Sequence, residues 1–298
     1  LNVTVGDKAP SFIGPSSEAV CMLNITMNNN SMGINNSVDS IKITIHNDTG
    51  FGNITKLAAL SGTEGSGVSI YKESGQTPEF QLGEDTLVGI PGQWNGTGPF
   101  WDVLITFSST ITVPNSSFDP LLYVIIRSSD EISDLDMFNV SINASGVNST
   151  FGVAPLVTAA SSPITADTLP PAFTGKVVDD ALLPYVYYDP STDIIYYGDD
   201  MTSSQALVVR LTGVSDVLSG VANTTFPGLL GNNGTVVTTA PFSYRYDIEA
   251  NDTSSGLYYI KVYDNVGNYL GVNLSIQRDI TAPAITGVDV IELSDYLY

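Results

Sequence analysis

Three observations predict an all-β protein. Residues that favour strands, chiefly Val, Ile, Thr and Tyr, are common, and helix-forming residues are scarce. Hydrophobic residues make up 43% of the chain but charged residues only 14%, a balance typical of strands that bury one face. Apolar and polar residues alternate between turns rich in Gly, Asn, Asp and Pro. At 298 residues, the chain is long enough for about two domains with separate cores.

Three similar Pro-containing segments divide the chain. They are 9–14 (APSFIG), 170–175 (PPAFTG) and 282–287 (APAITG), and each follows an acidic residue and precedes a strand-like stretch. Proline favours an extended linker and cannot join a central sheet ladder, so these segments predict domain boundaries. We expect a larger β-sandwich domain over 9–166 and a second β-sandwich domain over 170–279.

A strand-like segment lies beyond each end of these two domains. Because an isolated apolar strand is not stable in water, we expect residues 1–8 to complete a preceding or neighbouring sandwich. Residues 280–298 are expected to form a linker and a first strand that pairs with a following or neighbouring domain. The apolar residues that would make these assembly contacts are Val3, Val5, Val288, Val290, Ile291 and Leu293. Either the chain continues as a repeat protein, or subunits complete one another's sheets by donor-strand complementation, or both ends pack on their own domains.

Alternating apolar residues locate the individual strands. In the larger domain, they predict that Ile41, Ile43 and Ile45 face inward. The other strands expected there are 68–71, 101–107, 121–127 and 138–142. In the second domain, the expected strands are 206–211, 236–239, 242–246, 257–263 and 270–276.

The end of the second domain resembles a known family. Residues 255–268 (SGLYYIKVYDNVGN), followed by Ile276, Asp279 and Pro283, are similar to the closing hairpin and linker of immunoglobulin-like repeats. Such repeats occur in bacterial and archaeal surface-layer proteins, surface filaments and adhesins. The resemblance implies tandem Ig-like antiparallel β-sandwiches joined by short Pro-containing linkers, at the cell surface. Most of those repeats are spacers, so the resemblance indicates fold and location more than function.

N-glycosylation sequons are far more frequent than chance predicts. Chance would place roughly four Asn in Asn-X-Ser/Thr triplets, whereas 15 of the 21 Asn lie in one. The excess indicates selection for glycan acceptor sites in a secreted protein. The sequon residues are Asn2, Asn24, Asn29, Asn35, Asn47, Asn53, Asn95, Asn115, Asn139, Asn143, Asn148, Asn223, Asn233, Asn251 and Asn273.

Several sequons fall in predicted strands. In 138–143, apolar residues alternate with Asn139, Ser141 and Asn143, which places two glycans on one outer face. Glycans there would also block edge-to-edge aggregation of exposed sheets. The alternative, that Asn is simply common in polar turns, accounts for Asn29, Asn35 and Asn233 but not for the strand sites.

Charge and cysteine content limit the function classes. The net charge of −21 would repel nucleic acid and anionic lipid, and calcium is its natural counter-charge. The single cysteine, Cys21, lies in an apolar run and is expected in the core, so no intrachain disulfide forms. No apolar run is long enough for a membrane span. We expect an extracellular or cell-surface protein.

Catalysis has few candidates, and we expect no enzyme. His46, the only histidine, is predicted to face outward beside Asn47, which argues against Ser-His-Asp and Cys-His catalysis. Zinc sites need His or Cys clusters. A glycosidase built on two carboxylates is an open but weak alternative, because 31 acidic residues will form some pairs by accident.

The sequence requires no cofactor besides covalent N-glycans, but two acidic loops could hold calcium; the alternative is that they are simply solvated acidic loops. The candidate ligands are Asp130, Asp134, Asp136, Asp189 and Asp193. The turn 264–268 (DNVGN) is explained by turn chemistry alone, and it would bind calcium only if another carboxylate converged on it. Aromatic residues, including Trp94, Trp101, Tyr187 and Tyr196, could stack on sugars and keep a carbohydrate-binding adhesin or accessory module open, although core and interface packing explains them equally well.

These observations predict a structural subunit of a heavily N-glycosylated extracellular filament, fibril or surface layer. Its partners would be other copies of itself, forming a homopolymer joined end to end by strand complementation, and glycans.

Overall fold

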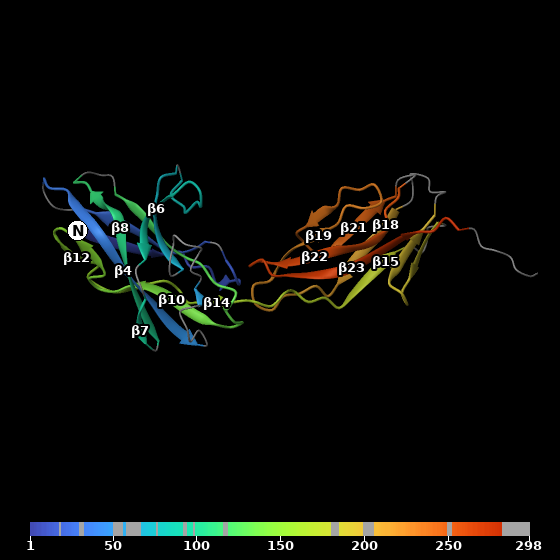
Figure 1. The fold of residues 1–298 in the computed structure, drawn as a ribbon, viewed down its shortest axis with the longest axis horizontal. Coiled ribbons are helices and arrows are strands. Elements are labelled where there is room, and N and C mark those ends of the chain that lie inside the picture. Colours follow the sequence, from blue (N-terminus) through green and yellow to red (C-terminus); the bar gives the residue numbers. More distant parts are fainter. Residues whose placement is uncertain are drawn as a thin grey trace, which may run out of the picture. The chain divides into compact units, whose positions relative to one another are not determined.

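The computed structural model describes residues 1–281 except 18, 30–32, 50–55, 58–66, 76, 92–93, 98, 116–118, 180–184, 199–205 and 249–251. This part of the chain contains strands β1 to β23 and no α-helix, so the predicted all-β class is confirmed (Figure 1). The chain divides into two units. The first contains Leu1–Pro171, Ser215–Val221 and Tyr263–Tyr269, and the second contains the remaining segments from Ala172 on.

The first unit is built on one sheet of 14 strands. Its main order is β1-β3-β9-β5-β6-β8-β4-β10-β14-β2, and β7, β11, β12 and β13 pair beside this path. The strands are β1 (Asn2–Asp7), β2 (Phe12–Ile13), β3 (Val20–Asn28), β4 (Asn36–Thr49), β5 (Val68–Lys72), β6 (Thr86–Pro91), β7 (Asn95–Thr97), β8 (Phe100–Val113), β9 (Leu121–Ile126), β10 (Met137–Ile142), β11 (Val147–Ser149), β12 (Gly152–Ala154), β13 (Ala159–Ala160) and β14 (Ile164–Ala166).

The alternation in the sequence places the core of this unit. Ile41, Ile43 and Ile45 on β4 are fully buried, as predicted, and residues from strands as distant as β3 and β10 join the same cluster. The sheet therefore bends around one large core, and a smaller separate cluster of Tyr71, Tyr123 and Ile125 lies in the same unit. Ser141 on β10 differs from the prediction that it faces solvent. It is only 6% exposed, because β13 pairs with β10 at this residue.

Two separate sheets form the second unit. One has the order β15-β18-β21 and the other β16-β17-β23-β22-β19-β20, which is the predicted sandwich arrangement. Leu207 and Val209 on one sheet, and Ile260 and Leu274 on the other, are fully buried. The strands are β15 (Gly175–Asp179), β16 (Val186–Asp189), β17 (Ile194–Tyr197), β18 (Ala206–Thr212), β19 (Val221–Phe226), β20 (Thr235–Val237), β21 (Ser243–Asp247), β22 (Gly256–Asp264) and β23 (Tyr269–Arg278).

The N-terminal strand lies in the first unit of the same chain. β1 pairs antiparallel with β3 from Asn2↔Asn28 to Asp7↔Leu23 and forms an edge of the sheet. Val3 and Val5 pack against the core cluster from this edge. A single chain thus provides its own partner for residues 1–8, whereas Val288, Val290, Ile291 and Leu293 lie outside the described residues.

Candidate metal centre

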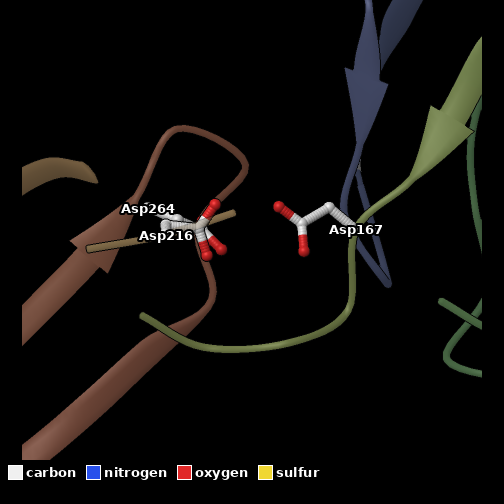
Figure 2. A group of neighbouring side chains, drawn as sticks. All are labelled: Asp167, Asp216 and Asp264. Carbon is white, nitrogen blue, oxygen red and sulfur yellow. The ribbon is translucent and has the colours of Figure 1, made fainter. Parts of the chain in front are cut away.

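Three aspartates converge at one point of the first unit. Carboxylate oxygens of Asp167, Asp216 and Asp264 all lie within 4.8 Å of one another, and Figure 2 shows the carboxyl group of Asp167 pointing toward those of Asp216 and Asp264. Asp167 is 1% exposed, Asp264 is 2% exposed, and Asp216 is half-buried. Among the described residues, this is the one group of three or more His, Cys, Asp or Glu side chains close enough to share a metal ion.

The three aspartates come from three separate segments of the chain. Asp167 directly follows β14, Asp216 lies in the loop after β18, and Asp264 is the last residue of β22. All three segments belong to the first unit, because it includes the loops Ser215–Val221 and Tyr263–Tyr269.

The carboxylates of Asp216 and Asp264 each stabilise a turn by accepting hydrogen bonds from the backbone N–H groups two and four residues later. Oδ1 of Asp216 accepts hydrogen bonds from the backbone N–H of Leu218 (3.1 Å) and Gly220 (2.8 Å). Oδ1 of Asp264 accepts equivalent bonds from Val266 (3.0 Å) and Asn268 (2.8 Å). Short Asp side chains that accept from the backbone two residues on stabilise such turns, and here they also fix the direction of each carboxyl group.

Asn268 and Ser219 connect these turns to Asp167. The side-chain amide of Asn268 donates to the backbone oxygen of Asp167 (2.9 Å) and to Oδ2 of Asp264 (2.7 Å). The backbone N–H of Ser219 donates to Oδ2 of Asp167 (3.0 Å). The three carboxyl groups are therefore held in place by hydrogen bonds between the segments that carry them.

No cationic side chain neutralises this group among the described residues. The ion pairs found there join Lys42 to Asp102, Lys56 to Asp136, Lys176 to Asp193 and Arg245 to Asp247. Burial raises the pKa of Asp264, against the opposing effect of its hydrogen bonds from Asn268 and the neighbouring backbone. Convergent oxygen ligands without nitrogen or sulfur match the preference of hard divalent cations, calcium above all.

The first predicted calcium loop does not form such a group. Asp136 is 3% exposed and pairs with the ammonium of Lys56 at 2.5 Å, so its charge is already compensated. Asp134 accepts a hydrogen bond from the backbone of Thr168, and Asp130 is exposed. The structure does not bring these three carboxylates together.

Asp189 and Asp193, in the second predicted loop, belong to no group of three or more such side chains within the part of the chain that the structure describes. Asp189 accepts hydrogen bonds from the backbone and hydroxyl of Ser191 and from Thr192, an ordinary turn arrangement. Asp193 pairs with Lys176 at 2.7 Å and accepts from the hydroxyl of Tyr188. Both aspartates therefore already have hydrogen-bond or ion-pair partners within the fold.

The sequence pointed to one of the three converging residues, Asp264, and to the requirement that another carboxylate lie close to it. The turn beginning at Asp264 required a second carboxylate, and Asp167 and Asp216 supply two. Asp216 was missed, although Asp216 to Gly220 repeats the five-residue spacing of Asp264 to Asn268. That repeated spacing was the available signal.

The sequon asparagines are mostly accessible. Asn53 and Asn251 lie outside the described residues. The exposed sequon asparagines are Asn2, Asn35, Asn95, Asn115, Asn148, Asn233 and Asn273, and the half-buried ones are Asn24, Asn47, Asn139, Asn143 and Asn223.

Asn29 is the exception among the described sequons. It is 7% exposed, and its Nδ2, the atom that would carry a glycan, donates to the backbone oxygens of Ile34 (2.7 Å) and Val113 (3.2 Å). The folded chain therefore does not offer this site to a glycan, which corrects the prediction for Asn29.

The two residues considered for nucleophilic catalysis have structural surroundings. The ring of His46 stacks on Phe100 with centroids 4.7 Å apart. Cys21 is half-buried, not fully buried as expected, and burial raises the pKa of its thiol to about 11.

The described part of the chain also has no helix with the length and apolarity needed to cross a membrane.

Comparison with solved structures finds remote likenesses. No protein-family model and no curated protein matches the chain. The adhesin InvE of Yersinia pseudotuberculosis is 10% identical with a TM-score of 0.23, over 92% of this chain, which spans 58% of the InvE chain. Murine CEACAM1b is 10% identical with a TM-score of 0.27, over 93% of this chain and 100% of its own. Domains D2 and D3 of the major pilin SpaD of Corynebacterium diphtheriae are 8% identical with a TM-score of 0.26, over 94% of this chain and 97% of their own.

Proposed function

We propose that this chain is a structural subunit of a heavily N-glycosylated extracellular assembly, a filament, fibril or surface layer at the cell surface. The observation that carries the proposal is the accessibility of the sequons. Of the 13 sequon asparagines in the described residues, seven are exposed and five are half-buried. A coat of glycans on a β protein suits a role outside the cell and leaves little free surface for a substrate.

The strand sequons illustrate the point. Asn273 on β23 is exposed, although its neighbours Val272 and Leu274 are 6% and 0% exposed. On β10, Asn139 is half-buried between Phe138 and Val140, which are both fully buried. The period of two separates core from acceptor residues on the same strand, so glycans fit without disturbing the core.

Mass spectrometry of the native glycoprotein tests this proposal. With only ten Lys and Arg in the chain, tryptic peptides are long, so chymotrypsin is the better protease. We expect glycans at most of the seven exposed sequons, such as Asn148 and Asn273, and none at Asn29. Asn232, Asn265 and Asn268, which lie in no sequon, serve as internal controls. Unmodified exposed sequons throughout would overturn the proposal.

We further propose that copies assemble by exchanging β1. This strand lies at a sheet edge and, among the described strands, pairs with β3 alone. Its Val3 and Val5 pack on the core, so its release would uncover β3 as an open, apolar edge. The strand of a second copy could restore the same pairing, with residues 8–11 as the hinge. The self-paired β1 is then the closed form of the subunit.

Cysteine cross-linking distinguishes exchange from self-pairing. Thr4 and Thr26 are direct partners in the β1–β3 ladder. In an unglycosylated Cys21→Ser background, Thr4→Cys chains are mixed with Thr26→Cys chains and oxidised. Exchange predicts a covalent dimer, whereas a mixture of Thr4→Cys with Leu135→Cys, an exposed site off this ladder, gives none. If only chains carrying both cysteines form a bond, and only internally, exchange is excluded.

A carbohydrate-binding module is the second candidate, favoured by one pocket of the second unit. This pocket of about 180 Å³ is lined by Tyr185, Tyr187, Tyr196, Tyr197 and Asp279. Tyr187 is 61% exposed and stacks on Tyr196 with centroids 6.4 Å apart. Aromatic faces beside a carboxylate suit the apolar face and hydroxyls of a sugar ring. Trp94 and Trp101, by contrast, pack against the core of the first unit.

Glycan-array binding tests the second candidate. Tyr187→Ala is expected to abolish any sugar binding of the native chain, whereas Tyr259→Ala, which removes a tyrosine that is 49% exposed outside the pocket, leaves it intact. Absence of binding by the native chain would remove this candidate.

A further inference from the structure

We propose that Asp167, Asp216 and Asp264 form a calcium-binding site in the first unit. Their carboxylate oxygens lie within 4.8 Å of one another, and the side chains come from three segments of the chain (Figure 2). The site is independent of the glycans and of strand exchange.

The first argument is electrostatic. Asp167 and Asp264 are nearly completely removed from water, and a third carboxylate lies beside them. Like charges repel more strongly where water is excluded, and a buried charge without a counter-ion is costly. No ion pair between described residues involves any of the three. A divalent cation would remove this cost at the point where the carboxyl groups face each other.

Ser219 provides a second, independent observation. Its backbone N–H donates to Oδ2 of Asp167, which places the residue at the site. Its side-chain Oγ is buried and has no hydrogen-bond partner within the described part of the chain. Buried hydroxyls are nearly always paired, so an unpaired one on a residue that is hydrogen-bonded to Asp167 indicates a missing partner. A hydroxyl oxygen is a suitable neutral ligand or a partner for a metal-bound water.

The hydrogen-bond pattern leaves coordination positions open. Oδ1 of Asp216 and Oδ1 of Asp264 accept the turn N–H groups. Oδ2 of Asp216 accepts no hydrogen bond from the described residues and is free to bind a cation. Backbone hydrogen bonds thus orient the carboxyl groups and still leave carboxylate lone pairs available to bind a cation.

The donor set favours calcium over other divalent ions. Calcium takes 6–8 oxygen ligands in a flexible geometry, whereas magnesium demands a small octahedral shell and retains its waters. Zinc prefers nitrogen and sulfur, which none of these side chains offers. Three carboxylates with solvent oxygens on the half-exposed side of Asp216 fit the calcium pattern.

Binding would tie three distant segments together. The loops Ser215–Val221 and Tyr263–Tyr269 would be fixed to the residue that follows β14. Because the unfolded chain has no preformed site, calcium binds the native state selectively and raises its stability.

Thermal unfolding of the full chain, stripped with EDTA and then titrated with CaCl2, tests the proposal. At calcium about 100-fold above the Kd, we expect the Tm to rise by about 5 °C or more, with a much smaller rise in MgCl2. Asp216→Asn, at the least buried ligand, is expected to lose the rise. The matched control, Asp130→Asn at an exposed aspartate outside the group, is expected to keep it.

A second measurement, on the wild-type chain, tests the proposal even if Asp216→Asn fails to fold. Terbium luminescence, excited through tyrosine in the wild-type chain, should saturate with one tight site and be reversed by calcium but not by magnesium. The proposal is overturned if calcium neither raises the Tm nor displaces terbium. It is also overturned if Asp216→Asn folds and keeps the full calcium response.

Discussion

Two nearly fully buried aspartates show how one residue type takes opposite roles. Asp136 is 3% exposed and lies against the ammonium of Lys56, so its charge is balanced within the fold. Asp167 is 1% exposed, and its carboxylate accepts hydrogen bonds from the backbone N–H groups of Leu169 and Ser219. A buried carboxylate that forms an ion pair with a lysine has a structural role. A buried carboxylate that faces two further carboxylates is a candidate metal ligand.

The Lys56–Asp136 pair leads to the first prediction. Lys56→Met leaves Asp136 buried without its counter-charge, so the unfolding free energy should fall by about 3–5 kcal/mol. Urea denaturation measures this change. Lys42→Met removes a pair whose lysine side chain is 45% exposed and should cost at most about 1 kcal/mol. Equal effects of the two substitutions would contradict the role assigned to burial.

Individual strands differ in how firmly they belong to the sheet. β10 lies inside it, between β4 and β14, and its inward residues are fully buried. β1 lies at an edge and is held by β3 alone along its length. At its end, Asp7 accepts hydrogen bonds from the backbone and hydroxyl of Ser162 and from the backbone of Ala9.

The second prediction concerns the pH dependence of β1. Partial burial alone would raise the pKa of Asp7, but the hydrogen bonds from Ser162 and Ala9 outweigh it and hold the pKa below its usual value. Because the folded pKa is lower than the unfolded one, this contribution to stability is present above about pH 4 and is lost as the pH falls through the folded pKa.

Hydrogen-exchange protection factors of the β1 amides check this. Protection should fall between pH 5 and pH 2 more for β1 than for β10. In Asp7→Asn, β1 should be less protected at pH 5 and should lose no additional protection on acidification. A wild-type β1 that keeps its protection relative to β10 at low pH would rule out the role of Asp7.

Across the whole molecule, the excess of acidic residues opposes compactness. With 31 acidic residues against ten Lys and Arg, the charges repel one another on average, and salt screens that repulsion. The third prediction is therefore that the urea midpoint of the EDTA-treated chain rises as NaCl increases from about 10 mM to about 100 mM, where the Debye length falls from about 30 Å to about 10 Å. A midpoint that falls with NaCl would show that attractive pairs dominate.

The sequence alone determined the fold class and, for strands such as β4 and β23, which side of the strand is buried. Period-two alternation reports directly on local geometry, so Ile41, Ile43 and Ile45, and Leu274 beside Asn273, could be placed without a structure. The sequons are likewise a local sequence signal. Only the folded structure shows that the side-chain nitrogen of Asn29 is engaged by the backbone oxygens of Ile34 and Val113.

Tertiary structure decided which acidic residues meet. Asp167, Asp216 and Asp264 are separated by more than forty residues each, and no local pattern states that their segments converge. The dense loop 130–136 looked richer in ligands, yet Lys56 neutralises Asp136 across the fold. Local periodicity arises from backbone geometry, so it can be recognised in the sequence. A metal site depends on long-range packing and on which carboxylates are paired with a lysine or arginine in the folded chain.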